Sequence, residues 1–335
     1  MSPKDQESLE ESREIRAYLI SKYGFIPESI IPADWSIKTD RRRQKTYLEH
    51  RKAGKNWGTA FSLSDLSSGQ LHSDFPHNVC RFFIKFLTED KLEEPGCYGN
   101  YLPTVLDPFA GHNSRMEDCF ATFRNYVGHD LCKEFMETNR EIREKLLTGT
   151  LWPQDSLPRL ALVEGDSRDT INYVEKFDMA ITSPPFWDIE QYGPEAEQLS
   201  EQKTFNDFMF SLGKVFSNVF KALKPNTFFV VEVNDFRRQG VFYTYHSSAI
   251  QWLQRVGFTI HDIVICDYQK SIQQAFAVQL DRIKVVGKRH SYFIVCSKQR
   301  KLEDTQEHRE RVAVKAHEYI EEKEPGEIKQ AVMMF

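Results

Sequence analysis

Short apolar runs recur along this chain, separated by loops or by segments with helical spacing. The runs lie at 104–107, 125–130, 160–166, 177–183, 228–233, 259–265 and 291–297. Runs of this length are typical of buried strands. Between the fourth and fifth runs, apolar residues repeat every three or four positions from Phe205 to Leu223, which predicts a long helix that Lys224-Pro225-Asn226 ends.

The order of these elements predicts the fold class. Strands that alternate with helices form a mostly parallel sheet that is covered on both faces. The last two runs have no helical segment between them, which favours an antiparallel pair at one edge. We therefore predict an α/β, Rossmann-like fold with a seven-stranded, mostly parallel sheet and a terminal antiparallel pair.

Composition narrows the class of protein. The 335 residues are 40% hydrophobic and 28% charged, as in ordinary globular proteins, and no apolar run approaches the roughly 18 residues of a membrane helix. The six scattered cysteines include no C-x-x-C pair, which argues against a zinc module or a disulfide framework. We expect a cytoplasmic protein without a membrane contact or a required metal, in which Cys266 and Cys296 serve packing.

The chain divides by pattern into three parts. Residues 1–70 form an N-terminal extension, with a polar helix expected over 1–22 and an irregular region, rich in aromatic and charged residues, after it. Residues 71–300 carry the alternating helices and strands and form the main domain. Residues 301–335 are highly charged, which predicts a solvated helix or tail.

Acidic or polar residues follow the first three strands, and ligands bind at the carboxyl ends of such strands. The first strand leads into the turn 107–111, the second ends at Asp130, and the third ends at Asp166-Ser167. A glycine such as Gly111 lets the backbone approach a ligand, and a carboxylate can accept hydrogen bonds from two ribose hydroxyls. Each aspartate could instead cap the helix that follows it. The absence of G-x-G-x-x-G disfavours a dinucleotide and is consistent with S-adenosylmethionine (SAM).

The most specific signal is Thr182-Ser183-Pro184-Pro185-Phe186, at the end of the fourth strand. An exocyclic amine of a nucleobase is a poor nucleophile because its lone pair is delocalised into the ring. A serine hydroxyl and a backbone carbonyl, held rigid by two prolines, can accept its two hydrogens and favour the attacking geometry. Phe186 offers a ring to a base that has left the helix. A plain strand-ending loop is the alternative.

These motifs resemble those of the DNA amino-methyltransferases, in the branch with T-S-P-P-[YFW]. The resemblance covers roughly residues 71–300, and it implies a class I SAM-dependent methyltransferase that flips a DNA base and methylates it directly. Ser-Pro-Pro more often accompanies methylation of cytosine N4 than of adenine N6, so cytosine is favoured. The matching segments are DPFAG (107–111), GHD (128–130), GDS (165–167), TSPPF (182–186) and the helix-like segment 74–87 that would help enclose the methionine end of SAM.

Residue roles follow from these motifs. Asp130 would hold the ribose, Asp166 with Ser167 the adenine, and the turn 107–111 the methionine end. The catalytic candidates are Ser183, Pro184, Pro185 and Phe186, and the cofactor-binding candidates are Phe75, Pro76, Asp107, Pro108, Phe109, Ala110, Gly111, Asn113, Asp130, Asp166 and Ser167.

Two features depart from the family pattern. The first turn reads Gly111-His112-Asn113 where Gly-Ser-Gly is usual, although asparagine tolerates a left-handed conformation. The order is also permuted, because the SAM motifs precede TSPPF here. Only about 70 residues separate them, so target recognition must come from elsewhere.

Candidate DNA contacts lie in the basic stretch 41–55, in the loop 187–203, after the fifth strand, and in 269–289. The net charge of −5 is a weak guide, because DNA meets a local surface. Each of these regions could also be an ordinary solvated surface. The candidates are Arg41, Arg42, Arg43, Lys45, Trp187, Arg237, Arg238, Gln273 and Arg282.

Other functions stay open at this point. Adenine N6 of DNA or a base amine of RNA could be the target of the same chemistry. A non-catalytic DNA-binding subunit that kept the fold is a further alternative. The sequence specifies no target site, oligomeric state or restriction partner.

Overall fold

The computed structural model describes residues 3–23, 27–32, 76–88, 102–111, 114–150, 156–189, 198–268, 284–286, 290–298 and 314. Its chain divides into two compact units, one formed by residues 1–28 with 301–335 and the other by residues 29–300. In the first unit, the polar helix predicted over residues 1–22 is α1, Pro3–Tyr23. Our functional boundaries near 70 and 300 stay predictions.

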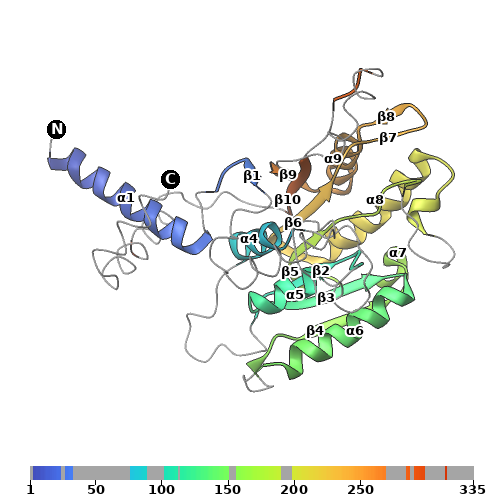
Figure 1. The fold of residues 1–335 in the computed structure, drawn as a ribbon, viewed down its shortest axis with the longest axis horizontal. Coiled ribbons are helices and arrows are strands. Elements are labelled where there is room, and N and C mark those ends of the chain that lie inside the picture. Colours follow the sequence, from blue (N-terminus) through green and yellow to red (C-terminus); the bar gives the residue numbers. More distant parts are fainter. Residues whose placement is uncertain are drawn as a thin grey trace, which may run out of the picture. The chain divides into compact units, whose positions relative to one another are not determined.

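An eight-stranded sheet forms the centre of the second unit (Figure 1). All seven predicted strands are present, and the order across the sheet is β1-β9-β10-β6-β5-β2-β3-β4. Strands β2 to β6 run parallel, and β9 with β10 forms the predicted antiparallel pair. Strand β10 is also antiparallel to β6. The strands are β1 (Ile30–Pro32), β2 (Thr104–Asp107), β3 (Asn125–Asp130), β4 (Leu160–Glu164), β5 (Phe177–Thr182), β6 (Leu223–Val233), β9 (Thr259–Asp267) and β10 (His290–Lys298).

The eighth strand, β1, lies in a region that we expected to be irregular. It pairs in parallel with β9, with Ile30 opposite Ile265, and Ile31 is fully buried. Three residues are too few to show an alternating pattern. Pro32 ends the strand at the edge of the sheet, a position that tolerates a residue without an N–H group.

Helices pack in two groups against the sheet. The group of α4, α5 and α6 forms contacts within itself, and so does the group of α7, α8 and α9. The long predicted helix is α8; it starts after the N-cap Thr204, whose side chain accepts a hydrogen bond from the backbone of Asp207, and β6 follows it directly. The helices are α4 (His77–Leu87), α5 (Ser114–Ala121), α6 (Lys133–Thr148), α7 (Ser167–Thr170), α8 (Phe205–Ala222) and α9 (Tyr245–Val256).

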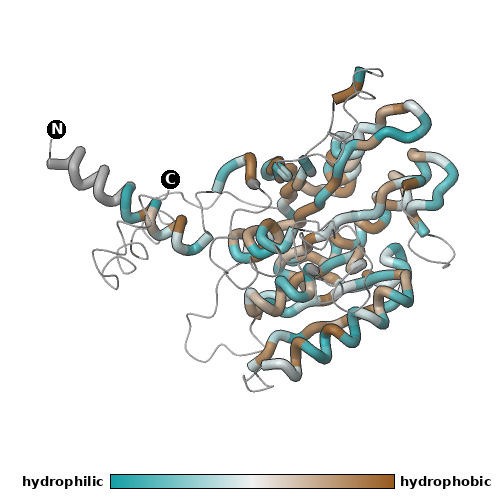
Figure 2. Tube along the Cα trace, viewed as in Figure 1, coloured by the Kyte–Doolittle hydropathy of each residue, from teal (hydrophilic) through white to brown (hydrophobic). Residues whose placement is uncertain are grey.

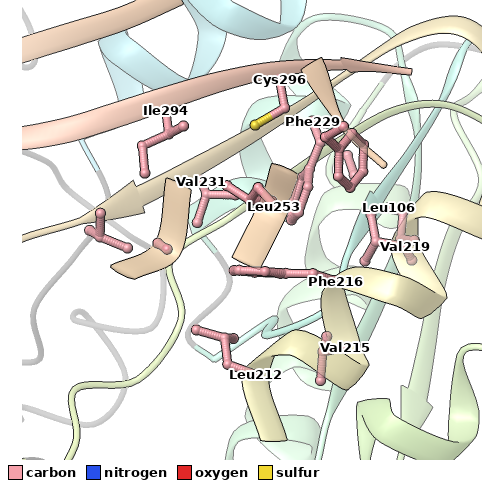
Figure 3. Packing of buried hydrophobic residues seen from close by; sticks show 14 of the residues in the cluster. Leu106, Leu212, Val215, Phe216, Val219, Phe229, Val231, Leu253, Ile294 and Cys296 are labelled. Carbon is pink, nitrogen blue, oxygen red and sulfur yellow. The ribbon is translucent and has the colours of Figure 1, made fainter. Parts of the chain in front are cut away.

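The apolar core lies between the central strands and these helices. Figure 2 shows apolar residues along the strands and an alternation of apolar and polar stretches along α6, as expected for a helix that covers a sheet with one face. In Figure 3, Phe216 of α8 lies near Phe229 of β6, and the two rings meet edge to face at 5.7 Å. On β10, Cys296 is buried, as is Cys266 on β9, as predicted for both.

The two faces of β6 have different neighbours. Phe229 and Val231 belong to the core formed with α8 and α9. Val230 and Glu232 alternate with them along the strand, so their side chains point to the other face. Glu232 lies directly opposite Phe293 of β10, and Phe293 stacks on Phe83 of α4 at 5.2 Å. Glu232 therefore lies on the α4 side of the sheet. No helix in the described part of the chain is both long and apolar enough to cross a membrane.

Candidate active site

Asp107, the last residue of β2, is buried, and its carboxylate accepts four hydrogen bonds. One oxygen accepts from the Thr182 hydroxyl at 2.8 Å and from the Phe109 N–H at 3.2 Å. The other accepts from Arg115 Nε at 2.5 Å and from the Tyr126 hydroxyl at 2.9 Å. A carboxylate has about four lone-pair sites, and in Asp107 these four protein donors occupy them. The role that we predicted for Asp107 towards the methionine end of SAM stays a prediction. Its contacts show that it holds the turn after β2 and Thr182 in place.

Arg115 extends this support to the turn after β2. Its guanidinium donates to the carbonyls of Phe109 at 2.5 Å and Ala110 at 3.2 Å. Burial alone would lower the pKa of Arg115, but the charge of Asp107 outweighs it and the pKa is raised. The turn after β2 and Thr182, the residue before Ser183, are thus connected through one buried ion pair.

Asp130, at the end of β3, holds the same turn from the other side. It accepts hydrogen bonds from the N–H groups of Gly111 at 2.7 Å and Cys132 at 2.8 Å. Burial raises its pKa to about 6, although these two hydrogen bonds act in the opposite direction. Two of its roughly four acceptor sites are left for hydroxyl groups of a ligand. Gly111 has a φ of +47°, so its left-handed conformation favours glycine.

The end of β4 is organised as a helix cap. Asp166 accepts a hydrogen bond from the Arg168 N–H at 2.8 Å and forms an ion pair with the Arg168 side chain. The Ser167 hydroxyl donates to the carbonyl of Pro108 at 2.5 Å. Capping, the alternative considered for each aspartate, therefore applies to Asp166. The roles of Asp166 and Ser167 towards adenine stay predictions.

The loop 183–186 follows β5 directly and is supported by aromatic rings. Pro184 is buried, whereas Ser183 and Phe186 are half-buried. The Tyr245 hydroxyl donates to the carbonyl of Pro185 at 3.3 Å. The ring of Phe186 meets those of Phe236 at 5.9 Å and Tyr245 at 6.0 Å, both edge to face. The proline pair and these rings hold the loop in one conformation.

Glu232, a buried carboxylate beside this loop, was not predicted from the sequence. Burial raises its pKa, while hydrogen bonds from Tyr268, Ser291 and Ser183 act in the opposite direction. The Tyr268 hydroxyl lies 3.0 Å from the Glu232 carboxylate and 3.1 Å from the Ser291 hydroxyl. A single acid inside the apolar run 228–233 was the available signal, because a buried acid needs partners.

The remaining candidates are distributed unevenly. Trp187 donates from Nε1 to the carbonyl of Gln202 at 2.7 Å and packs on Tyr243 at 5.2 Å, so it supports the loop. Pro76 is buried before α4. Arg237 and Arg238 are exposed. Outside the described residues lie Phe75, Asn113, Arg41, Arg42, Arg43, Lys45, Gln273 and Arg282.

The described residues fit SAM as a ligand. Asp130 keeps acceptor capacity for ribose hydroxyls, and the space around a Cβ at Gly111 is open, with the Phe109 oxygen at 3.8 Å. The negative charge of the Asp130 carboxylate also suits a ligand that carries a cationic sulfonium. The strand order, with the chain's first Rossmann strand β2 at the centre and an antiparallel β10 between β6 and β9, is that of class I methyltransferases. The protein has the fold of this class of SAM-dependent methyltransferases.

Comparisons with known proteins show similarity to one family of DNA-modifying enzymes. The DNA methylase family (N6_N4_Mtase) matches residues 177–332, which include the loop 183–186. Residues 177–332, a little under half of the chain, are thus similar to this amino-methyltransferase family, and SAM is the methyl donor that the similarity implies. The Type II methyltransferase M.SmaI of Serratia marcescens is 26% identical over 84 residues, which are 24% of this chain and 28% of that protein. The match thus spans less than a third of that relative.

Three solved structures are similar at low sequence identity. TrmN from Thermus thermophilus is 12% identical, with a TM-score of 0.38, over 70% of this chain and 51% of that one. A TehB-like SAM-dependent methyltransferase from Corynebacterium glutamicum is 11% identical, with a TM-score of 0.40, over 77% of this chain and 100% of that one. A SAM-dependent methyltransferase from Methanosarcina mazei is 11% identical, with a TM-score of 0.40, over 61% and 96%. The fold assignment depends on the strand order of this chain.

Proposed function

We propose that this protein methylates an exocyclic amine of a flipped DNA base, with cytosine N4 as the favoured target. One observation carries the proposal: Ser183 stands in a proline-stiffened loop at the end of β5, beside the buried carboxylate of Glu232 on the neighbouring strand β6. The neighbouring strand, β2, ends in the turn of the candidate cofactor site. The two halves of a methyl-transfer site are therefore adjacent.

Ser183 and the Pro184 carbonyl would bind the amine. With its hydrogen directed towards Glu232, the Ser183 hydroxyl would keep lone pairs on its oxygen for one amine hydrogen. The Pro184 carbonyl accepts the second. These two acceptors favour the pyramidal amine of the transition state over the flat one of the free base. The amine nitrogen would form the new bond to the methyl carbon as the bond from that carbon to the sulfonium sulfur breaks, and it would lose one hydrogen as a proton to water.

The rest of the loop would orient the base. Phe186 presents a half-buried ring to the base, and Phe236 and Tyr245 fix that ring from behind. When bound, SAM supplies the electrophilic methyl group. Asp130 would hold its ribose, Asp166 and Ser167 its adenine, and residues 107–111 its methionine end.

DNA is the proposed partner. The family match and the similarity to a Type II methyltransferase support a role in DNA modification, with restriction–modification as the biological setting. Serine at position 183 favours cytosine N4. Adenine N6 is the second candidate, because the same family includes enzymes of both kinds.

Nucleoside analysis tests the proposal. The full chain would be incubated with isotope-labelled SAM and either unmethylated genomic DNA or total RNA, and the digested nucleosides would be analysed by mass spectrometry. We expect labelled N4-methylcytosine from DNA, and none with Ser183→Ala. Labelled N6-methyladenine in DNA would show that the target base is adenine and not cytosine. Label in RNA alone would overturn the DNA assignment. The absence of label from both would favour a non-catalytic subunit.

A further inference from the structure

A short β-hairpin follows the end of β6, next to the loop 183–186. Its strands are β7 (Phe236–Arg238) and β8 (Val241–Tyr243), which pair antiparallel with Arg238 opposite Val241. The two turn residues, Gln239 and Gly240, have φ values of +49° and +82°. Two-residue turns with positive φ at both positions match the twist of the strands and give a well-defined hairpin. Figure 1 shows this hairpin projecting from the end of β6.

The root of the hairpin is packed onto the candidate active site. Phe236 and Tyr243 stack on each other at 5.3 Å, with an angle of 19° between the rings. Phe236 also meets Phe186, and Tyr243 meets Trp187. The hairpin therefore has a fixed position relative to the loop that would hold the base.

The outer part of the hairpin is apolar, basic and exposed. Val241 is 54% exposed and Phe242 is 40% exposed, and Ile189 of the adjacent loop is 48% exposed. The Arg237 guanidinium lies 4.9 Å above the Phe242 ring, and Arg238 forms an ion pair of 2.7 Å with Asp188. Val241 and Phe242 point to opposite faces, because side chains alternate along a strand, so the outer part of the hairpin carries an exposed apolar residue on each face. The arginines favour a partner with phosphate groups.

We propose that the β7–β8 hairpin enters duplex DNA beside the target base. Extrusion of a base leaves a gap in the stack, and proteins commonly fill or open such steps with apolar side chains. Val241 and Phe242 are placed for this, with Arg237 and Arg238 to contact the flanking phosphates. A strand of three residues reaches roughly 10 Å, which exceeds the depth of either groove. This inference rests on the proposed function and assigns base extrusion to the hairpin.

The test compares paired with unpaired substrate. Transfer of tritium from labelled SAM would be measured on unmethylated genomic DNA, native or heat-denatured, with the wild type and with Val241→Ser/Phe242→Ser. Because Val241 and Phe242 would act on stacked bases, we expect the rate of label transfer to fall by about tenfold or more on native DNA and by about twofold or less on denatured DNA. Val174→Ser is the matched control, since Val174 is 77% exposed in the loop before β5, at the other end of that strand. It should transfer label at the wild-type rate on both substrates.

Two outcomes would overturn the hairpin proposal. One is an unchanged rate on native DNA, and the other is an equal fall on both substrates, which would indicate damage to the active site or a surface for a protein partner. Arg237→Gln/Arg238→Gln gives a second measurement that leaves the apolar residues in place. The salt dependence of its duplex affinity should be shallower than that of the wild type, by about one unit of logarithmic slope per lost phosphate contact; an unchanged slope would contradict the phosphate contacts. If the wild type labels neither form of DNA, the proposed function itself fails.

Discussion

The two halves of the candidate site are built from different interactions. The cofactor half consists of the ends of β2, β3 and β4, where Asp107, Asp130 and Asp166 each accept hydrogen bonds from backbone N–H groups. The base half consists of the loop 183–186 and the end of β6, where most contacts are between rings. Its polar contacts include the group around Ser183 and Glu232 and the hydrogen bond from Tyr245 to the Pro185 carbonyl. One half is organised by charge, and the other by packing.

The difference corresponds to what each half would bind. A cofactor with hydroxyl groups and a sulfonium charge is held well by fixed carboxylates in a buried site. A base offers flat, apolar faces and one amine, for which rings and two acceptors suffice. The Asp107–Thr182 hydrogen bond is the direct polar connection between the halves that the described residues show. Substitutions should therefore have distinct signatures in each half.

The largest effect is expected for substitution of Asp107, which connects the two halves through Thr182. Asp107→Ala leaves Arg115, which is 5% exposed, without its carboxylate. An unpaired buried charge costs about 3–5 kcal/mol, so the free energy of unfolding in urea should fall by that amount. The control is Glu144→Ala, which removes an exposed ion pair with Arg143 on α6 and should cost less than about 1 kcal/mol. Equal losses for the two variants would show that the charge network does not support the fold.

Ser183→Ala should separate the halves by function. Removal of one preorganised polar group from a transition-state site lowers kcat by about 100-fold to 1,000-fold. The dissociation constant of SAM, measured by calorimetry, should stay at the wild-type value because Ser183 belongs to the base half. Ser183→Thr keeps the hydroxyl and should lose less. A parallel loss of SAM affinity in Ser183→Ala would mean that the two halves are not separate.

In the cofactor half, Asp130 should make SAM binding depend on pH. Its pKa is about 6 because it is buried. Above that pH the carboxylate is ionised and can accept from both ribose hydroxyls, so affinity should fall, by up to about tenfold per pH unit, as the pH drops through 6. Asp130→Asn should bind about tenfold more weakly at pH 8 and lose this dependence. Asp169→Asn, an exposed neighbour in α7, should keep it. A flat wild-type profile would contradict the ribose role.

Much of this organisation could be predicted from the sequence. Apolar runs bounded by turns located seven strands, because burial on both faces leaves a continuous apolar signal. The strand β1 was missed because Ile30–Pro32 is too short for any periodicity. Asp166 shows the limit for site residues: an acid after a strand has the same sequence signature whether it caps a helix or binds a ligand.

The base half was predictable in its motif but not in its support. Ser-Pro-Pro-Phe is contiguous, so its stiffness and chemistry are visible in the sequence. Its supporting residues, Phe236 and Tyr245, are about 50 and 60 positions away and become neighbours through the β5–β6 pairing and the position of α9. Only the fold brings such residues together. The hairpin turn Gln239-Gly240 was missed because the glutamine at its first position does not favour the positive φ that the turn requires.

The smallest and most discriminating effect is expected at Glu232, the acid of the base half. Burial raises its pKa above the ordinary 4.5, so the pH at which it protonates lies above that value. When protonated, Glu232 no longer serves as the charged acceptor for Ser183, and kcat at saturating SAM should fall as the pH is lowered through its pKa. Saturation with SAM separates this effect from that of Asp130.

Glu232→Gln keeps the shape and the contact with Tyr268 but removes the charge. Because hydrogen bonds to charged groups contribute about 1.5 kcal/mol or more, kcat should fall by about tenfold at neutral pH. The further fall of kcat at low pH, the acid limb of the pH profile, should be absent in this variant. Glu164→Gln, an exposed acid at the end of β4, should keep both the rate and the profile of the wild type. If Glu232→Gln retains the acid limb, that limb belongs to another group, and Ser183 is held by geometry alone. In that case packing would organise the base half completely, and the contrast with the cofactor half would be sharper still.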